Sequence, residues 1–421
     1  MNQSASMACQ PIDETTLGRC YSSLAVFLMG AIVLVVPSGY TYGAGLLLLG
    51  SLILLYLRPA LHLQQEDRQL MAVLAMYSLL FCAQLWLEGA DASAFDRPSR
   101  FIFAVPVLLF VLAYPPRLAL LWSGLVVGGL LTAGWAVWQK LFLGIERATG
   151  YTYVIQFGNI SMLMGIFCLA GLGWAAVQPR ARSWMAFMLL GALAGMLGSL
   201  LSGSRGGWIG LPLIFWMLYR AYGREVRRSI RLWGLALVCT GAVLLYSLPQ
   251  TGLHSRVQQA FTDIELFQQG DKWTSLGARL DMWQGALQLI AEKPLTGWGW
   301  SGYRQGMQAL ADDGIVIQFA AENHAHNEML DAQARRGILG LLSLLALYLV
   351  PLRLFSRRLR AEDLELRSLA LAGALLPVAF MDFGLSQVFF GHNSGVMVYA
   401  FWLVVLWGCM RTRERQLGQV R

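Results

Sequence analysis

Long apolar runs alternate with short polar segments along most of the chain. Residues 45–57, for example, read GLLLLGSLILLYL and contain no charged side chain. Such runs are too continuous for membrane β-strands, in which apolar and polar residues alternate. A helix needs about 20 apolar residues to cross a bilayer. The pattern therefore predicts an all-α polytopic membrane protein with about 12 transmembrane helices.

The apolar runs also divide the chain into segments. We expect membrane-spanning helices near 21–36, 41–57, 69–87, 101–113, 118–138, 158–177, 184–201, 207–219, 232–248, 337–352, 368–381 and 394–410. The predicted order is a cytoplasmic tail (1–20), transmembrane helices 1–9 (21–248), a long loop (249–336), helices 10–12 (337–410) and a second tail (411–421).

The long loop has a pattern of its own. Apolar residues recur at helical spacing at Leu276, Leu280, Trp283, Leu287 and Ile290. The pattern ends at Pro294, before a glycine-rich GWGWSGY stretch at 297–303. A connection of this length between two spans is unusual. We therefore expect 249–336 to fold as a helical extracytoplasmic cap whose apolar face points toward the membrane.

Composition and charge support this organisation. The chain is 57% hydrophobic and 13% charged, which excludes an ordinary water-soluble globule. With the N-terminus in the cytoplasm, the cytoplasmic segments hold 20 Lys and Arg residues and the short outer segments hold five. The positive-inside rule then places both termini in the cytoplasm and the long loop outside. The net charge of +8 is thus explained by topology and lipid contact, so nucleic-acid binding is not expected.

Two arginines are expected on the outer side, where positive charge is scarce. Arg205 lies between two apolar runs, beside glycines that allow backbone N–H groups to approach a ligand closely. Arg279 opens the amphipathic stretch, one turn before Trp283. The alternatives are an interfacial arginine at 205 and a solvated arginine paired with Asp281 at 279. Two guanidinium groups could together bind a diphosphate, because each offers a planar fork of donors.

A pair of histidines precedes the tenth predicted span. His324 and His326 stand in ENHAHNEML, two of only five histidines in the chain. An imidazole titrating at pKa roughly 6–7 suits a general base. If the helix starts near this point, only one of the two rings faces a given site. A hydrogen-bonded structural histidine and a metal pair are the alternatives, although no third metal ligand has convincing spacing.

The other candidates are less specific. Arg335 and Arg336 precede the tenth span on the outer face, where they could contact phosphate or lipid headgroups or anchor the helix at the interface. His62, His254 and His392 have weak cases. The six cysteines form no CxxC pair, so zinc or thioredoxin chemistry has no support.

Three stretches resemble the O-antigen ligase family, within the group that includes O-antigen polymerases and protein O-oligosaccharyltransferases. They are SGSRGGW at 202–208, R-x-x-x-W at 279–283 with KPLTGWGWSGY at 293–303, and HAHNEMLDAQARRGILGLL at 324–342. Their order and the long outer loop also match, and the resemblance covers roughly residues 185–350.

The resemblance implies a membrane glycosyltransferase of the bacterial inner membrane, active on the periplasmic side in lipopolysaccharide biosynthesis. The donor would be a polysaccharide on undecaprenyl diphosphate and the acceptor a sugar hydroxyl of lipid A–core. Transfer would be inverting and would need neither metal nor cofactor. The family's diphosphate-binding arginines fall on Arg205 and Arg279, and its general base on His326; the role of His324 is less certain. Asn327, Trp283, Arg335 and Arg336 would be possible acceptor or lipid contacts.

Three alternatives stay open at this stage. An O-antigen polymerase would use a second lipid-linked glycan as acceptor, and a protein O-oligosaccharyltransferase would use a Ser or Thr hydroxyl. A polysaccharide–lipid transporter or flippase is a different class, favoured by broken spans and buried charges.

Overall fold

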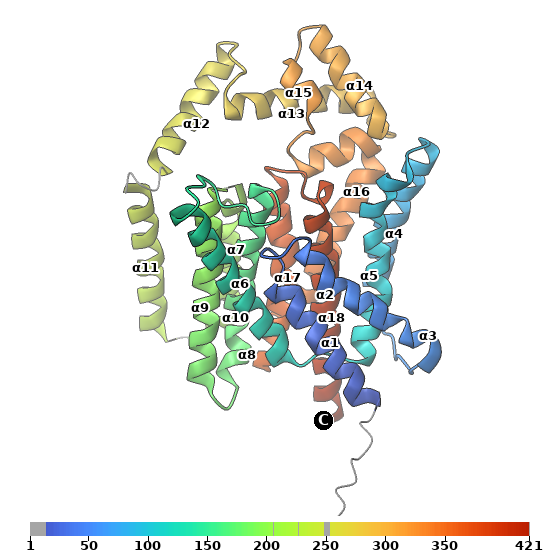
Figure 1. Ribbon diagram of the computed structural model, residues 1–421, viewed down its shortest axis with the longest axis vertical. Helices are drawn as coiled ribbons and strands as arrows, with labels where there is room; N and C mark the ends of the chain where they lie inside the picture. Colours follow the sequence, from blue (N-terminus) through green and yellow to red (C-terminus); the bar gives the residue numbers. More distant parts are fainter. Residues whose placement is uncertain (1–13, 205, 226, 248–252, 421) are drawn as a thin grey trace, which may run out of the picture.

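The computed structural model describes residues 14–204, 206–225, 227–247 and 253–420, and it is helical throughout (Figure 1). Helices make up 79% of the chain and no strand occurs within those ranges. The prediction of an all-α protein is therefore confirmed.

Each predicted span coincides with one helix or a pair of consecutive helices. The first half of the chain contains α1 (Glu14–Ala31), α2 (Gly39–Ser51), α3 (Ile53–Leu57), α4 (Gln65–Leu87), η1 (Ala92–Phe95), α5 (Asp96–Ala113), α6 (Leu118–Leu141), α7 (Val154–Ala170), α8 (Leu172–Ala176), α9 (Ala181–Ser202), η2 (Gly206–Trp208) and α10 (Leu211–Tyr222). The second half contains α11 (Arg228–Ser247), α12 (Leu253–Gln268), α13 (Ser275–Glu292), α14 (Gly299–Asp312), α15 (Gln318–Glu322), α16 (Glu328–Ser356), α17 (Leu364–Gly384), η4 (Phe389–Gly391) and α18 (Asn393–Val420).

Eight helices or helix pairs in the described ranges are long and apolar enough to cross a membrane: α2 with α3, α4, α6, α7 with α8, α9, α16, α17 and α18. Helices also form over the other four predicted spans, as α1, α5, α10 and α11, but these are not among the eight. The 12 residues of α10, for example, fall short of the roughly 20 needed for a full crossing. The chain is a multi-pass membrane protein, and the count of twelve crossings stays a prediction.

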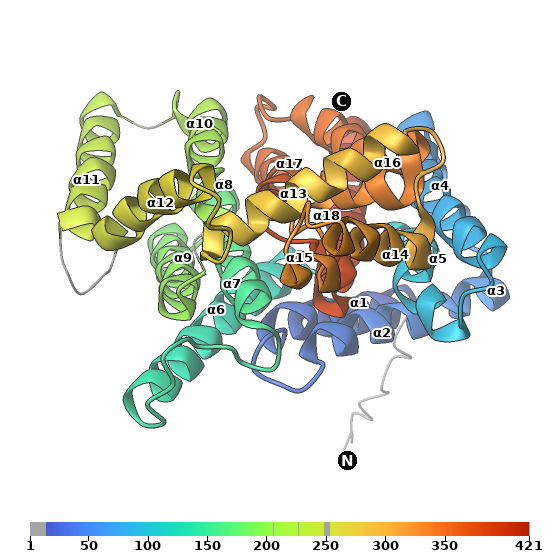
Figure 2. The same ribbon diagram turned by 90° about the horizontal axis from the view of Figure 1, so that it is seen from above.

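The helices form an upright bundle with α12–α15 lying across one of its ends (Figure 1). In both views α11 stands apart from the other upright helices and leads into α12 (Figures 1 and 2). The bundle centre is formed by α17 and α18, whose apolar windows are 83% and 94% buried, together with α7 and α8, at 83%. At the end opposite the cap, α1 begins and α18 ends (Figure 1).

The segment α12–α15 has its own hydrophobic core, and we call this segment the cap. The core joins α13, α14, α15 and the start of α16 through Met282, Ala286, Leu289, Tyr303, Met307, Val316, Ala320 and Ala334. The predicted helix is confirmed as α13, but its most buried face is offset from the predicted one, of which Trp283 and Ile290 pack partly buried against the cap core. The buried face carries Ala278, Met282 and Ala286, whereas Leu287 is 54% exposed. Small side chains on the buried face allow α14 and α15 to pack closely against α13.

A backbone contact docks the cap on the bundle. The helix α16 is interrupted at Gly337, which has φ 61° and ψ −162°. At this break the amide of Ile338 donates to the carbonyl of Pro294 (3.0 Å). A Cβ atom on Gly297 or Gly337 would lie within 2.5 Å of the opposing backbone, and both residues have positive φ, so only glycine fits. The glycine-rich stretch after Pro294 thus fixes the cap to α16.

Candidate active site

The two histidines of the third motif lie together in the loop between α15 and α16. Their ring centroids are 4.1 Å apart, and the amide of His326 donates to Nδ1 of His324 (3.1 Å). His326 adopts a left-handed φ of 47°, which is uncommon for a residue other than glycine. The helix α16 begins only at Glu328, so the two histidines are not helical and their rings need not face opposite sides. Both imidazoles belong to one cluster.

Neighbouring side chains hold this loop in place. Asn327 caps α16, because its side-chain oxygen accepts hydrogen bonds from the amides of Met329 (3.0 Å) and Leu330 (3.1 Å). The indole N–H of Trp283 donates to the carbonyl of Ala325 (2.9 Å), between the two histidines. The structure thus gives both Asn327 and Trp283 a positioning role.

Burial favours the neutral form of both imidazoles. Burial lowers the pKa of His326 to about 4, and the neighbouring His324 and Arg279 add to the effect. Burial also lowers the pKa of His324. A proton on either ring would be poorly solvated and repelled by nearby cations. The pKa of His326 in this structure is therefore lower than the 6–7 expected from the sequence.

Arg279 lies on the first turns of α13, close enough to lower the pKa of His326. It does not pair with Asp281, which is fully buried and instead binds Nζ of Lys272 at 2.6 Å. Burial and the nearby Arg147 lower the pKa of the Arg279 guanidinium. Among the described residues no carboxylate forms an ion pair with Arg279. A partly buried arginine in this setting is suited to bind an anion.

Arg205 lies outside the described residues, but the turn on either side of it is described. Gly203 ends α9 in the left-handed conformation, with φ 65°. The amide of Ser204 donates to the hydroxyl of Ser202 (3.0 Å). The backbone carbonyl of Ser202 accepts a hydrogen bond from Nε of Arg147 (3.0 Å). The described residues before Arg205 thus end α9 in a left-handed glycine, with Arg147 against the carbonyl of Ser202.

Arg335 and Arg336 occupy different surroundings. Arg335 binds Asp331 (2.9 Å), and its guanidinium lies 4.3 Å from the ring centroid of Tyr303 in the cap. Arg336 lies over the ring of Phe81 on α4, at 4.2 Å. These contacts join α16 to the cap and to α4.

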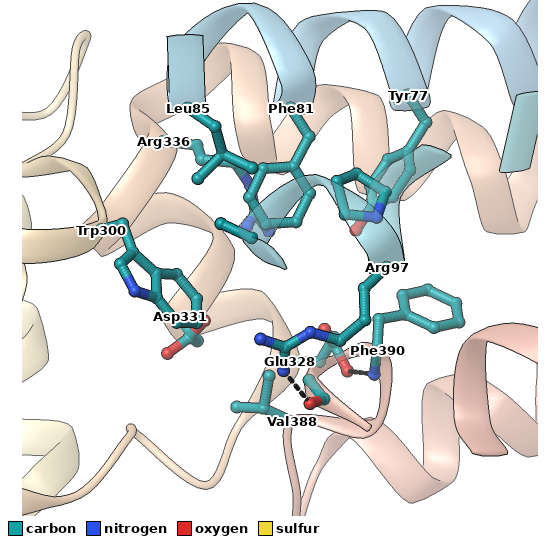
Figure 3. Close-up of a pocket in the computed structure, with 13 residues that line it drawn as sticks. Tyr77, Phe81, Leu85, Arg97, Trp300, Glu328, Asp331, Arg336, Val388 and Phe390 are labelled. Atoms are coloured by element: carbon teal, nitrogen blue, oxygen red, sulfur yellow. Dashed lines mark hydrogen bonds between the residues drawn. The ribbon is translucent and has the colours of Figure 1, made fainter. Parts of the chain in front are cut away.

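Arg336 also lines a small cavity with Arg97, Trp300 and Glu328 (Figure 3). Its volume is about 30 Å³, which is space for about one or two water molecules and too little for a sugar. Glu328 is buried beside it and accepts from the amide of Phe390 (3.0 Å), which ties α16 to η4 (Figure 3).

Three residues that the sequence interpretation left aside also belong to the cluster. Gln387 lies close to His326, and its side-chain amide hydrogen-bonds to Nε2 of His392 (3.2 Å). Burial, with His324 and Arg97, lowers the pKa of His392 to about 4. Arg147 faces Arg279, as described above. The only signals in the sequence were the rarity of histidine and of outer-side arginine, and neither relates these positions to His326.

The remaining histidines add nothing to the cluster. The carbonyl of His62 accepts from Arg415 (3.1 Å) near the end of α18, away from the cap. The side chain of His254 lies outside the part of the chain that the structure describes. Within that part, no three His, Cys, Asp or Glu side chains are arranged to hold a metal ion.

The residues that form this arrangement are similar to those of known proteins. A family model described as O-antigen ligase matches residues 190–345. The matched residues resemble an O-antigen ligase domain. All three motifs, the cap and the histidine pair fall within the matched residues or directly beside them, so the resemblance inferred from the motifs is confirmed.

Two relatives extend the O-antigen ligase match. An O-antigen ligase of Escherichia coli (strain K12) is 24% identical over 257 residues, which cover 58% of this chain and 57% of that protein. An uncharacterized protein of Haemophilus influenzae is 28% identical over 380 residues, 90% of this chain and 95% of its own. The chain is thus similar to an O-antigen ligase over part of its length and to an uncharacterized protein over most of it.

Proposed function

We propose that the protein is an O-antigen ligase. It transfers O-antigen polysaccharide from undecaprenyl diphosphate to a sugar hydroxyl of lipid A–core. The observation that carries the proposal is the cluster of neutral histidines beside Arg279 at the cap end of the bundle. The O-antigen ligase match at residues 190–345 supports the same reaction.

His326 is the general base in this proposal. Its neutral imidazole accepts the proton of the acceptor hydroxyl while that oxygen attacks the anomeric carbon. The new glycosidic C–O bond forms as the bond between the anomeric carbon and the diphosphate oxygen breaks. A single displacement from the face opposite the leaving group inverts the anomeric centre. A general base contributes typically about 10²–10⁴-fold to such a step.

Arginines stabilise the leaving diphosphate. Arg279 and Arg205 are the proposed ligands, and Arg147, which lies near Arg279 and the turn after α9, is a third. Negative charge grows on the diphosphate as the glycosidic bond breaks, and fixed guanidinium donors stabilise that charge without reorganising. The donor is already activated, so the chain's own residues suffice for both tasks.

The orientation belongs to the same proposal. The protein lies in the inner membrane with both termini cytoplasmic and the long loop 249–336, which includes the cap, in the periplasm. The placement of α1 and of the end of α18 opposite the cap supports this orientation (Figure 1). Polymerised O-antigen on its lipid carrier and lipid A–core then reach the site from the membrane.

The deciding experiment supplies purified protein with lipid-linked O-antigen and lipid A–core and identifies the product by mass spectrometry. Glycan joined to lipid A–core supports the ligase. Lengthened lipid-linked glycan means a polymerase, and glycan on an added Ser/Thr peptide means a protein oligosaccharyltransferase. Donor that crosses the vesicle bilayer without any new bond means a transporter. Each of the last three results contradicts the proposal.

A further inference from the structure

An open groove at the cap end of the bundle borders the small cavity of Figure 3, with which it shares Arg97 and Gly391. Its volume is about 730 Å³. Four segments that are far apart in the sequence form its walls: the start of α2, the η1–α5 junction, the loop before α7 and the start of α18. A groove of this volume that is open to solvent can hold several sugar rings of a longer chain.

Tyrosine rings line this groove. Tyr151 and Tyr153 are 46% and 72% exposed, and Tyr40 lies across from them on α2. Both exposed rings are held by neighbours. The ring of Tyr151 packs on Trp135 with centroids 5.4 Å apart, and that of Tyr153 meets His392 edge-on at 5.2 Å. Such rings offer flat apolar faces with a hydroxyl at one end.

The other lining groups are polar and nearly balanced in charge. Asp96 pairs with Arg100 (2.6 Å), and the guanidinium of Arg97 donates to the carbonyl of Gly391. Asn393 adds an exposed amide. Flat apolar faces alternating with hydrogen-bonding groups match a pyranose ring, which has apolar C–H faces and a rim of hydroxyls. A lipid tail would leave these polar groups unpaired.

The groove reaches the histidine cluster at one end. His392 lines the groove and hydrogen-bonds to Gln387 through Nε2 (3.2 Å), and Gln387 and His392 both lie close to His326. A glycan lying along the tyrosines therefore has its end directed toward the proposed base.

We propose that the groove formed by Tyr40, Asp96, Tyr151, Tyr153, His392 and Asn393 is a glycan-binding site for the sugars next to the reacting one. This site rests on the proposed function, because it assumes that a glycan is a substrate. The glycan is either the core oligosaccharide of the acceptor or the repeat units of the donor. The two have the same recognition chemistry.

The test measures binding of free oligosaccharides, with no transfer needed. Saturation-transfer NMR is recorded on the full-length protein in detergent, first with core oligosaccharide released from lipid A–core and then with free O-antigen repeats. The variants are Tyr153→Ala and the double variant Tyr151→Ala/Tyr153→Ala. Tyr56→Ala is the matched control, since Tyr56 is 87% exposed on α3, toward the other end of the bundle.

We expect the parent to bind one of the two oligosaccharides. Removal of each tyrosine ring should weaken oligosaccharide binding by up to about tenfold, while the Tyr56→Ala control should bind the oligosaccharide as the parent does. Binding of core oligosaccharide assigns the groove to the acceptor, and binding of repeats assigns it to the donor. If the parent binds neither oligosaccharide, or if the double variant binds as tightly as the parent, the proposal that the groove is a glycan-binding site is refuted.

The two proposals can fail separately. If the parent joins glycan to core and the double variant keeps the parent's KM for both substrates, the groove is refuted while the ligase stands. If the parent binds oligosaccharide through the tyrosines but joins no glycan to core, the ligase is refuted while the groove stands.

Discussion

The pH dependence of transfer tests the electrostatic surroundings of His326. An ordinary imidazole has a pKa of 6.5, whereas that of His326 is about 4, because of burial and then of His324 and Arg279. At pH 5.5 roughly 97% of His326 is therefore neutral, compared with roughly 9% of an ordinary imidazole. Since only the neutral ring accepts a proton, kcat/KM should stay near its maximum down to about pH 5 and fall as the pH approaches 4.

Bound donor should move this limit. The diphosphate brings negative charge beside Arg279, cancelling part of the repulsion that disfavours a proton on His326. The acid limb of kcat, which reports the enzyme–substrate complex, should then lie at higher pH than the limb of kcat/KM. In the free protein, Arg279→Gln should raise the pKa of His326, but not as far as 6.5, because burial is the largest cause and persists.

The measurement follows histidine Cε1–H signals by NMR across pH 3.5–8, alongside the rate profile. With five histidines in the chain, His326→Gln assigns the signal. His62→Gln serves as the control and should leave the profile unchanged. A His326 signal that titrates near 6.5 in the free parent, or an Arg279→Gln variant with the parent's pKa, would refute the electrostatic argument.

Other predictions test separate parts of the site. Arg279→Ala should lower kcat roughly 10²-fold or more, because a charge-assisted donor to the diphosphate is lost. Arg279→Lys should restore little activity, because lysine lacks the bidentate fork of arginine. Near-normal activity of the lysine variant in a donor-saturated assay would mean that only local charge matters. His324→Ala should lower kcat roughly tenfold or more, because its ring supports His326; unchanged kcat would make His324 incidental. Gly297→Ala should lower the free energy of unfolding by roughly 2–4 kcal/mol, because the new side chain is strained at positive φ and overlaps α16. The control Gly314→Ala has a similar φ but open space around it, so it should lower the free energy of unfolding less. Equal losses in denaturant titrations would argue against the role of Gly297 in docking the cap. Reporters fused at positions 225 and 270 should lie on opposite sides of the membrane, and a shared side would contradict the topology. EDTA should leave transfer intact, and inhibition that a divalent ion reverses would contradict the metal-independent mechanism.

The helices could be predicted from the sequence because the bilayer imposes a simple rule. Long uncharged runs must be helical in lipid, and each predicted span coincides with a helix or a pair of consecutive helices. The face of α13 could not be predicted in the same way. Its buried side combines Met282 and Leu289 with glycine and alanine residues, and the burial of the small residues depends on close approach by α14 and α15 rather than on hydropathy. Large apolar side chains such as Leu287 were the misleading signal.

The site was predictable only in part, for a similar reason. Motifs along the chain identified His326, Arg279 and the turn after α9, since each stands in a distinctive local sequence. His392 and Arg147 have no such surroundings and reach the cluster through packing of α18 and of the loop before α7. The low pKa of His326 likewise depends on burial and on a cation from another helix, which no single segment encodes.

The most direct test of the account compares parent and His326→Ala in the purified transfer reaction, with donor binding measured in parallel. The account predicts core-linked glycan with an inverted anomeric linkage from the parent. The variant should bind donor as the parent does but lose roughly 10²–10⁴-fold in rate, the usual contribution of a general base. Full turnover by the variant, or a retained anomeric configuration in the parent's product, would contradict the account.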